Sequence, residues 1–471
     1  MIYPDLEMEI PETLERVHFV GIGGAGMSAI AHMMHENGVR VTGSDRGANY
    51  STEALAALGV GIAIGHDAAH VGDADAVVVT GALSPDNPEY RNAIERGIPV
   101  LHRSQALAWL AAQKKLIAVA GAHGKTTSTG MLVNGLLGLG RHPSFVNGSV
   151  ISGLGVASAT GSDDLFVIEA DESDKSFLIY DTSVALVTNV DPEHLDFYGS
   201  REHFMQAFVD FALGARELLV ISADDPGALE VLQTLKQTPS HPPIRTFGFA
   251  DDADVRIVSV DTTAQAIIEV EIAGERYREQ LRVFGRYNAV NAAGALAVLT
   301  GLGLDPAASL RAIAEFEGTQ RRFEFHGEPN GVRVYDDYAH HPTEVRALLE
   351  SARSVTGDGQ LIVVHQPHLF SRTKTFYREF AEAFEHGADH TIVLEIDRVR
   401  EEPDPSTTGA IVTDAFTDSS KGEYVDDWDV AISKVKSMAR PGDIVLVVGA
   451  GSVYKIVPQL VAALEQSSGD A

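Results

Sequence analysis

The sequence contains no cysteine, and its basic residues are scarce beside its acidic ones. Without cysteine the chain can form no disulfide, no thiolate metal site and no cysteine nucleophile. Lys and Arg number 36 against 66 Asp and Glu, which gives a formal net charge of −30. Such a surface would repel nucleic acid and anionic membranes, so neither is expected as a partner.

Long apolar runs are missing as well. No stretch of about 18 consecutive apolar residues occurs, so no membrane-spanning helix is expected. The opening segment MIYPDLEMEIPETLER is acidic and lacks the apolar core of a signal peptide. The sequence therefore predicts a cytoplasmic protein, and its 471 residues suggest about three domains.

Apolar, strand-like runs alternate with helix-like stretches along the whole chain. This alternation is typical of parallel sheets flanked by helices, so the predicted fold class is α/β. Residues 1–113 are predicted to form a Rossmann-like domain, residues 114–324 a P-loop ATPase-like central domain, and residues 325–471 a second Rossmann-like domain. Within the central domain, DVRIVSV and AIIEVEI alternate apolar and polar residues, which predicts a small antiparallel region.

A glycine-rich segment follows the first predicted strand. Gly21, Gly23 and Gly26 match the pattern G-x-G-x-x-G between a strand and a helix. Small residues there let the backbone approach a pyrophosphate at the start of the helix. Asp45 ends the next strand, where an NAD-binding protein carries a ribose-binding acid. The pattern indicates a phosphate-containing ligand more than NAD itself, and a turn needed only for tight packing is the alternative.

A second loop of this kind, GAHGKTT, follows the apolar run LIAVA. It differs from a full Walker A motif because Val119 occupies the place of the first glycine. Its chemistry still suits a nucleoside triphosphate. Backbone N–H groups can surround phosphate oxygens, Lys125 can reach the β- and γ-phosphates, and the Thr126 hydroxyl can bind Mg²⁺.

Two acidic segments, IEADESD and NVDPEHLD, each follow a predicted buried strand. Carboxylates at the carboxyl ends of parallel strands lie over the ligand crevice and can hold Mg²⁺. Either segment alone would be interpreted as a solvated loop or a helix cap. After a GKTT loop, metal binding is the better interpretation.

Taken together, these segments resemble the Mur ligases over nearly the whole chain. The matching segments are FVGIGGAGMSAIA, GSD, GAHGKTT, FVNGS, IEADESDKSFL, TNVDPEHLDFYG, GRYNAVNAAGA, RRFE, DDYAHHPTEV, HQPHLFSRT and GAGSVYKI. The resemblance implies a ligase that uses ATP and Mg²⁺ in peptidoglycan synthesis. Within this family, the chain is most similar to the members that join L-alanine to the lactyl carboxylate of UDP-N-acetylmuramate through an acyl phosphate. The first loop would then hold the UDP-sugar diphosphate and the second loop ATP.

The resemblance also implies roles for individual residues. The residues on the UDP-sugar side are Gly21, Gly23, Gly24, Gly26, Met27, Ser44 and Asp45. Those on the ATP side are Gly121, Ala122, His123, Gly124, Lys125, Thr126, Thr127, Asn288, Asn291, Arg322 and Asp336. The implied metal ligands are Thr126, Glu169 and His194, and the amino-acid side is Tyr338, His340, His368 and Arg372. The implied catalytic set is Lys125, Glu169, His194, His340 and Arg372.

Some alternatives stay open at this point. Ala122 stands where the family usually has Thr, and Leu369 stands where some relatives carry Arg. The segment DDYAHHP could also be a strand end and a helix start at Pro342 with exposed histidines, or a metal site. The rival functions are a ligase that attaches a whole tripeptide to the same UDP-sugar, an NAD-dependent dehydrogenase and a non-catalytic UDP-sugar sensor. Both a monomer and a homodimer fit the sequence.

Overall fold

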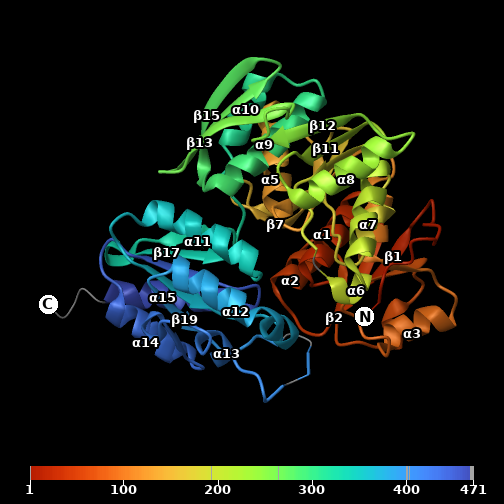
Figure 1. Cartoon of the computed structure of the whole chain (residues 1–471). Coiled ribbons are helices and arrows are strands. Elements are labelled where there is room, and N and C mark those ends of the chain that lie inside the picture. Colours follow the sequence, from red (N-terminus) through yellow and green to blue (C-terminus); the bar gives the residue numbers. More distant parts are fainter. Residues whose placement is uncertain (1, 193, 264, 399–400, 403, 467–471) are drawn as a thin grey trace. The chain divides into compact units, whose positions relative to one another are not determined.

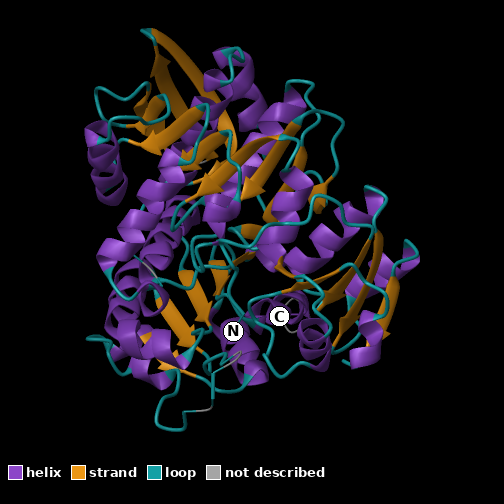
Figure 2. Ribbon diagram, turned by 90° about the vertical axis from the view of Figure 1, so that its right-hand side faces the viewer, coloured by secondary structure: helices purple, strands orange, loops and turns teal. Residues whose placement is uncertain are grey.

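The computed structural model describes residues 2–192, 194–263, 265–398, 401–402 and 404–466, and it contains three sheets (Figures 1 and 2). The chain divides into two compact units. The first unit comprises residues 1–258, 269–278 and 290–316, and the second comprises residues 259–268, 279–289 and 317–471. No described helix is both long enough and apolar enough to cross a membrane.

The first sheet has five parallel strands in the order β3-β2-β1-β4-β5. Its strands are β1 (Arg16–Val20), β2 (Arg40–Asp45), β3 (Gly61–Ile64), β4 (Ala76–Val79) and β5 (Val100–His102). The helices are α1 (Ala25–Glu36), α2 (Tyr50–Ala57), η1 (Ala68–Val71), α3 (Pro88–Glu95) and α4 (Arg103–Ala111). The chain proceeds from β1 to one side and then returns to the other. This change of direction makes the carboxyl end of β1, where the first glycine-rich loop lies, the topological switch point of the sheet.

The second sheet has ten strands in the order β15-β14-β13-β12-β11-β10-β6-β9-β7-β8. Its parallel part is β6 (Lys115–Ala120), β7 (Ser144–Ile151), β9 (Leu165–Glu169), β10 (Val184–Val187), β11 (Leu218–Ser222), β12 (Ile244–Gly248) and β13 (Val255–Asp261). The remaining strands are β8 (Val156–Ala159), which runs antiparallel to β7, β14 (Gln265–Ile272) and β15 (Glu275–Phe284). The helices are α5 (Lys125–Gly138), η2 (Ser176–Ile179), α6 (Leu195–Tyr198), α7 (Arg201–Leu213), α8 (Pro226–Gln237), α9 (Arg286–Gly301) and α10 (Pro306–Ala314).

The predicted antiparallel region has a local cause in the turn between β14 and β15. Ala273 and Gly274 both have positive φ angles, of 51° and 85°. Two positive φ angles in a two-residue connection are the geometry of a type I′ hairpin turn. The first of the two alternating segments, however, forms β13, which pairs parallel with β12.

The third sheet has six strands in the order β16-β17-β21-β18-β19-β20, of which only β16 runs antiparallel to its neighbour. Its strands are β16 (Glu324–Gly327), β17 (Arg333–Asp337), β18 (Leu361–His365), β19 (His390–Val393), β20 (Gly422–Tyr424) and β21 (Ile444–Val448). The helical segments are η3 (Pro329–Gly331), α11 (Pro342–Thr356), α12 (Phe370–Gly387), α13 (Ala410–Thr413), η4 (Ser419–Lys421), α14 (Trp428–Met438), η5 (Ser452–Ile456) and α15 (Val457–Glu465).

Two apolar cores enclose the third sheet. Leu361 and Val363 on β18 pack with residues of α11 and α12, such as Phe380. Ile362 and Val364, which alternate with them, pack with residues of α14 and α15. Helices therefore cover both faces, which explains why β21 is apolar at every position and β18 at every position but His365.

The three-domain α/β prediction is confirmed, with one sheet in each predicted domain. The predicted limits 1–113, 114–324 and 325–471 stay a prediction. The last limit falls within β16, which begins at Glu324.

Candidate functional site

The first glycine-rich loop connects β1 to α1 and is fixed by the end of β2. The Gly21 N–H donates to the Ser44 carbonyl at 2.8 Å, and the Gly23 N–H donates to Oδ2 of Asp45 at 2.8 Å. A Cβ atom at Gly23 would lie 2.5 Å from Nδ2 of Asn49 and 2.9 Å from Oδ2 of Asp45. The position therefore has room only for glycine, and the Asp45 carboxylate holds the loop backbone.

The loop ends at the start of α1, where Gly24 is the N-cap. No side chain donates or accepts a capping hydrogen bond there. The backbone N–H groups of a first helical turn attract anions, so this helix start suits a diphosphate. Gly26 and Met27 belong to this turn, and the Met27 side chain is buried in the core. Met27 can therefore contribute its backbone and not its side chain to ligand binding.

The Ser44 side chain faces a buried carboxylate. Its hydroxyl donates to Glu89 at 2.5 Å and lies 3.0 Å from Nδ1 of His66. Nδ1 of His70 lies 2.9 Å from the other Glu89 oxygen. Burial acts to raise the pKa of Glu89, but His18, Ser44 and His70 outweigh it and lower the pKa to about 2. Ser44 thus supports the loop through its carbonyl, while Glu89 holds its hydroxyl.

The second loop connects β6 to α5 and also depends on glycine. Gly121 and Gly124 have φ angles of 140° and 82°, which side-chain-bearing residues rarely adopt. A Cβ atom at Gly121 would collide with Oγ1 of Thr188, and one at Gly124 would lie 2.6 Å from Oδ1 of Asn291. The predicted ATP-side residue Asn291 therefore lies directly beside the loop. The loop backbone can surround a ligand only because these two positions lack side chains.

The end of β10 holds the middle of this loop. The His123 carbonyl accepts from Oγ1 of Thr188 at 2.7 Å and from Nδ2 of Asn189 at 2.8 Å. The His123 N–H donates to Oδ1 of Asn189 at 2.8 Å. Ala122 is buried beside it, so the missing hydroxyl at this position leaves the loop conformation supported by Thr188 and Asn189.

Lys125 begins α5 and lies among carboxylates. Its Nζ atom donates to the Gly121 carbonyl at 2.5 Å and pairs with Glu172 at 2.9 Å. Burial acts against its charge, but Glu172, Glu169 and Asp171 outweigh burial and raise the pKa of Lys125 above its ordinary value. Burial raises the pKa of Glu172 to about 7. The ammonium group is therefore charged and paired with Glu172.

The implied metal ligands lie at the carboxyl ends of neighbouring strands in the first unit. Thr126 is buried in the first turn of α5, and Glu169 ends β9. Oε2 of Glu169 accepts from the Gly148 N–H at 2.9 Å, which fixes the carboxylate. His194 has a φ angle of 54°, a conformation that is uncommon outside glycine and concentrates at functional sites. Hydroxyl and carboxylate oxygens are the donors that Mg²⁺ prefers, so Thr126 and Glu169 fit this ion.

In the second unit, Asp336 lies near the carboxyl end of β17 and is buried. Its Oδ2 accepts from Nε of Arg321 at 3.2 Å, and burial raises the pKa of Asp336 to about 7. Arg321 also donates to the carbonyls of Ala450 and Gly451 after β21, and its guanidinium lies 5.0 Å from the Tyr338 ring. Arg321 therefore connects two strand ends at the edge where the predicted residues lie.

The histidines of DDYAHHP are partly buried rather than exposed. Nδ1 of His340 lies 3.1 Å from the Tyr338 carbonyl and 3.4 Å from the Glu344 carboxylate. The ring centroids of His340 and His368 are 6.3 Å apart. Burial lowers the pKa of His340 to about 4 against the effect of Glu344, and the charge of Arg372 also lowers it. The predicted amino-acid side is thus one cluster around an uncharged imidazole.

Two further ATP-side predictions lie in the second unit. The guanidinium of Arg322 lies 5.5 Å from the Tyr338 ring and pairs with Glu344 at 3.9 Å. Nδ2 of Asn288, near the start of α9, donates to the Phe284 carbonyl at 2.8 Å. Arg322 therefore belongs to the cluster around Tyr338, and the nucleotide roles of both residues stay predictions.

The alternative interpretation of DDYAHHP as a strand end and a helix start describes the backbone correctly, because α11 begins at Pro342. Among the described residues, the one close group of possible metal ligands is Glu324, His326 and Asp336, with ligand atoms within 4.8 Å of one another. The backbone N–H of Arg321 donates to the Glu324 carboxylate, and its guanidinium already pairs with the Asp336 carboxylate. We therefore assign no metal to it.

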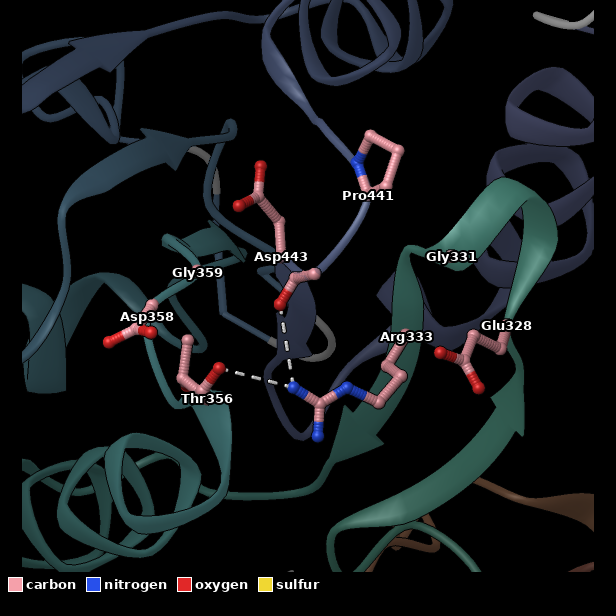
Figure 3. Close-up of a pocket in the computed structure, with 9 residues that line it drawn as sticks. Glu328, Gly331, Arg333, Thr356, Asp358, Gly359, Pro441 and Asp443 are labelled. Atoms are coloured by element: carbon pink, nitrogen blue, oxygen red, sulfur yellow. Dashed lines mark hydrogen bonds between the residues drawn. The ribbon is translucent and has the colours of Figure 1, made fainter.

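A cavity of about 610 Å³ lies at the end of the third sheet where its parallel strands begin (Figure 3). Nη1 of Arg333 donates to the Val355 carbonyl at 2.7 Å, and Nη2 donates to the Thr356 carbonyl at 3.3 Å. The lining residues are Glu328, Gly331, Arg333, Thr356, Asp358, Gly359, Pro441, Gly442 and Asp443. These residues lie where β17, β18 and β21 begin, whereas ligands of parallel sheets bind where strands end. The cavity is therefore separate from the candidate site.

Comparison with known proteins decides the family. Three family models match successive parts of the chain: the Mur ligase family catalytic domain at residues 16–115, the Mur ligase middle domain at residues 119–299, and the Mur ligase glutamate ligase domain at residues 321–451. The whole chain is also 57% identical to 98% of the UDP-N-acetylmuramate–L-alanine ligase of Clavibacter michiganensis subsp. michiganensis. The chain belongs to the Mur ligase family. The resemblance stated from the sequence is confirmed.

Two more relatives of this Mur ligase agree over nearly the full length. The UDP-N-acetylmuramate–L-alanine ligase of Paenarthrobacter aurescens is 46% identical over 96% of this chain and 98% of that protein. The crystal structure of the UDP-N-acetylmuramate–alanine ligase of Thermotoga maritima matches with a TM-score of 0.80 and 28% identity. That match covers 97% of this chain and 100% of the other. The dehydrogenase alternative is thereby set aside.

Some supporting residues of this Mur ligase were missed by sequence reasoning. Thr188 and Asn189 hold the second loop, and Arg321 connects β17 to the loop after β21. The polar pair at the end of the apolar run VALV could have indicated Thr188 and Asn189. No local signal distinguishes Arg321 from Arg322.

Proposed function

We propose that this Mur ligase joins L-alanine to the lactyl carboxylate of UDP-N-acetylmuramate, with conversion of ATP to ADP and phosphate. The observation that carries this proposal is the pair of glycine-dependent loops, each at the start of a helix. A reaction between a UDP-sugar and ATP needs two such phosphate sites. The two relatives that are 57% and 46% identical both carry the name of this activity.

We assign the UDP-sugar diphosphate to the start of α1 and the ATP phosphates to the start of α5. At the first site, Gly23 keeps the backbone accessible and Asp45 keeps the loop in place. At the second site, Lys125 is already charged and lies against the loop carbonyls. It would leave Glu172 for the β- and γ-phosphates, which are the stronger anions.

The first chemical step joins two anions. An oxygen of the lactyl carboxylate attacks the γ-phosphorus of ATP, the bond to the β-phosphate oxygen breaks, and ADP leaves. Positive charge is needed to offset the repulsion between carboxylate and phosphate, and Lys125 supplies part of it. Bound Mg²⁺, held by Thr126 and Glu169 with His194, would supply further charge at the phosphates.

The second step is attack of the alanine amine on the acyl phosphate. The ammonium group of alanine first gives one proton to water, and the free amine then attacks the carbonyl carbon. The tetrahedral intermediate collapses to the amide, and phosphate leaves with the second proton of the amine. We assign the alanine side to His340, His368 and Arg372. His340 is uncharged at neutral pH and can accept a hydrogen bond from the ammonium group, while Arg372 can bind a carboxylate or phosphate. Water must be excluded meanwhile, because it would hydrolyse the acyl phosphate.

The test is phosphate release from ATP with Mg²⁺ and UDP-N-acetylmuramate, with L-alanine, glycine, L-serine or the tripeptide added in turn. Release that depends on L-alanine is expected. Release with the tripeptide alone would move the protein to the recycling ligases. No release with any acceptor, alongside intact UDP-sugar binding, would support the sensor and contradict the ligase. A cytoplasmic location and a monomeric or homodimeric state stay predictions.

A further inference from the structure

Arg103 begins α4 directly after β5, and it contacts a loop of the second sheet within the first unit. Its Nη2 donates to Oδ2 of Asp171 at 2.9 Å. The two side chains are 33% and 35% exposed, so the ion pair is only partly screened by water. Asp171 is fixed from its other side, because its Oδ1 accepts from the Ser173 N–H at 3.0 Å. The carboxylate is therefore held toward Arg103.

The other guanidinium nitrogen of Arg103 lies beside the first helical turn of α1. Nη1 is 3.8 Å from the position that a Cβ atom of Gly26 would occupy. Gly26 belongs to the turn whose N-cap, Gly24, makes no side-chain capping bond. One cation therefore lies between an anchored carboxylate and the helix start to which the diphosphate is assigned.

A guanidinium group suits this position better than an ammonium group. It presents several N–H donors in a rigid plane, so it can bind two anions from different directions at once. Asp171 would hold Arg103 in place while the site is empty. An arriving diphosphate would then compete with Asp171 for the same charge.

We propose that Arg103 binds the diphosphate of the UDP-sugar, and that Asp171 is an internal anion that occupies Arg103 until the ligand arrives. This inference rests on the proposed function, since it takes the UDP-sugar as the ligand of the first loop. It assigns opposite effects to the two members of one ion pair. Loss of Arg103 removes a charged donor from the diphosphate, whereas loss of the Asp171 charge removes a competitor.

Isothermal titration calorimetry with UDP-N-acetylmuramate, without nucleotide or metal, tests the proposal. Arg103→Gln should weaken binding about tenfold or more, as expected for the loss of a charge-assisted hydrogen bond. Asp171→Asn should tighten binding about two- to fivefold, a modest change that suits a partly exposed charge. The double variant should resemble Arg103→Gln. Arg103→Lys should be intermediate, because it keeps the charge and loses the planar group.

Three controls make the result specific. The same variants are titrated with UDP and with uridine, and the effects should persist with UDP and vanish with uridine. Arg16→Gln breaks a similarly half-buried pair with Asp75 at the start of β1, away from the loop, and should leave binding unchanged. Thermal unfolding of each variant verifies the fold.

Two outcomes would overturn the inference. If Arg103→Gln and Asp171→Asn weaken binding alike, the pair only holds the structure together. If Arg103→Gln binds as the wild type does, Arg103 does not contact the diphosphate. Failure of the wild-type protein to bind UDP-N-acetylmuramate would instead contradict the proposed function.

Discussion

Residues that lack a side chain shape both phosphate loops, and Gly23 offers a direct test. A methyl group at this position would press against Asn49 and Asp45, which fix the loop. We expect Gly23→Ala to raise KM for UDP-N-acetylmuramate about tenfold, with little change in KM for ATP. Gly47→Ala is the matched control, because nothing lies within 4 Å of its added Cβ atom. Steady-state kinetics with an unchanged UDP-sugar KM in Gly23→Ala would contradict the pyrophosphate role of the first loop.

Lys125 offers the complementary test at the second loop. Lys125→Met removes the only charge that this loop sequence directs at the phosphates. We expect kcat to fall by about 10²–10³-fold or more, as for loss of a charge that stabilises a transition state. UDP-sugar affinity should stay within about threefold, since that ligand is assigned to another helix start. Lys115→Met breaks the pair between Lys115, at the start of β6, and Glu217, just before β11, and should retain full activity. Loss of both functions in a folded Lys125→Met protein would contradict the two-loop assignment.

The sequence predicted residues that lie within short motifs, and it missed their partners. The pair of Lys125 and Glu172 spans 47 positions, and the bond from His123 to Asn189 spans 66. Both pairs exist because β6, β9 and β10 are neighbours in the sheet. No local sequence pattern shows which strands will be neighbours in the sheet. The resemblance implies the roles of the motif residues, and the fold shows which residues hold them in place.

At the scale of elements, two helices begin with the same Asp-Pro pair, but the two aspartates differ in their contacts. The Asp225 carboxylate caps α8 by accepting from the Ala228 N–H at 2.8 Å, and it also accepts from the Val190 N–H at 2.9 Å. Val190 opens the segment that leads to His194. The Asp305 carboxylate caps α10 by accepting from the Ala308 N–H at 2.8 Å.

This difference predicts separable effects. Both Asp225→Ala and Asp305→Ala should lower the free energy of unfolding by about 1 kcal/mol, as expected for a lost N-cap. Only Asp225→Ala should also raise KM for Mg²⁺·ATP, because it releases the segment before His194. Urea unfolding and steady-state kinetics on the two variants measure this. Equal kinetics in both variants would show that the cap has no influence on the nucleotide site.

Buried parallel strands were predicted more accurately than edge strands. Strands β11 (LLVIS) and β9 (LFVIE) are each apolar at four of their five positions. Helices on both faces force such strands to be apolar throughout, so the sequence marks them clearly. Short edge strands such as β8 and β20 carry no such mark. Their place is decided by a neighbouring strand that is distant in sequence.

At the scale of the whole molecule, buried uncharged histidines make stability depend on pH. Burial lowers the pKa values of His102 and His340 to about 4 and that of His365 to about 3. In the unfolded chain each returns to an ordinary value near 6.5. Between those values the unfolded state binds more protons, so stability is complete above pH 6.5 and falls as the pH drops toward the folded-state pKa.

His365 gives a measurable share of this effect. Its ring lies between Phe380 and Phe384 and is 1% exposed. Each proton taken up on unfolding changes stability by about 1.4 kcal/mol per pH unit. We expect His365→Leu to lose about 2 kcal/mol less than the wild type when urea unfolding is compared at pH 7 and pH 5. An unaltered slope in His365→Leu would refute the assignment.

The cavity beside Arg333 has a practical consequence for inhibitor discovery. A compound that fills it would favour the folded form and raise the melting temperature, since any ligand bound to the native state does so. It would do this at the edge of the third sheet where strands begin, while the predicted ligands bind where strands end. A thermal-shift screen of this enzyme would therefore select such compounds beside true competitors. Displacement of a labelled nucleotide would separate the two groups.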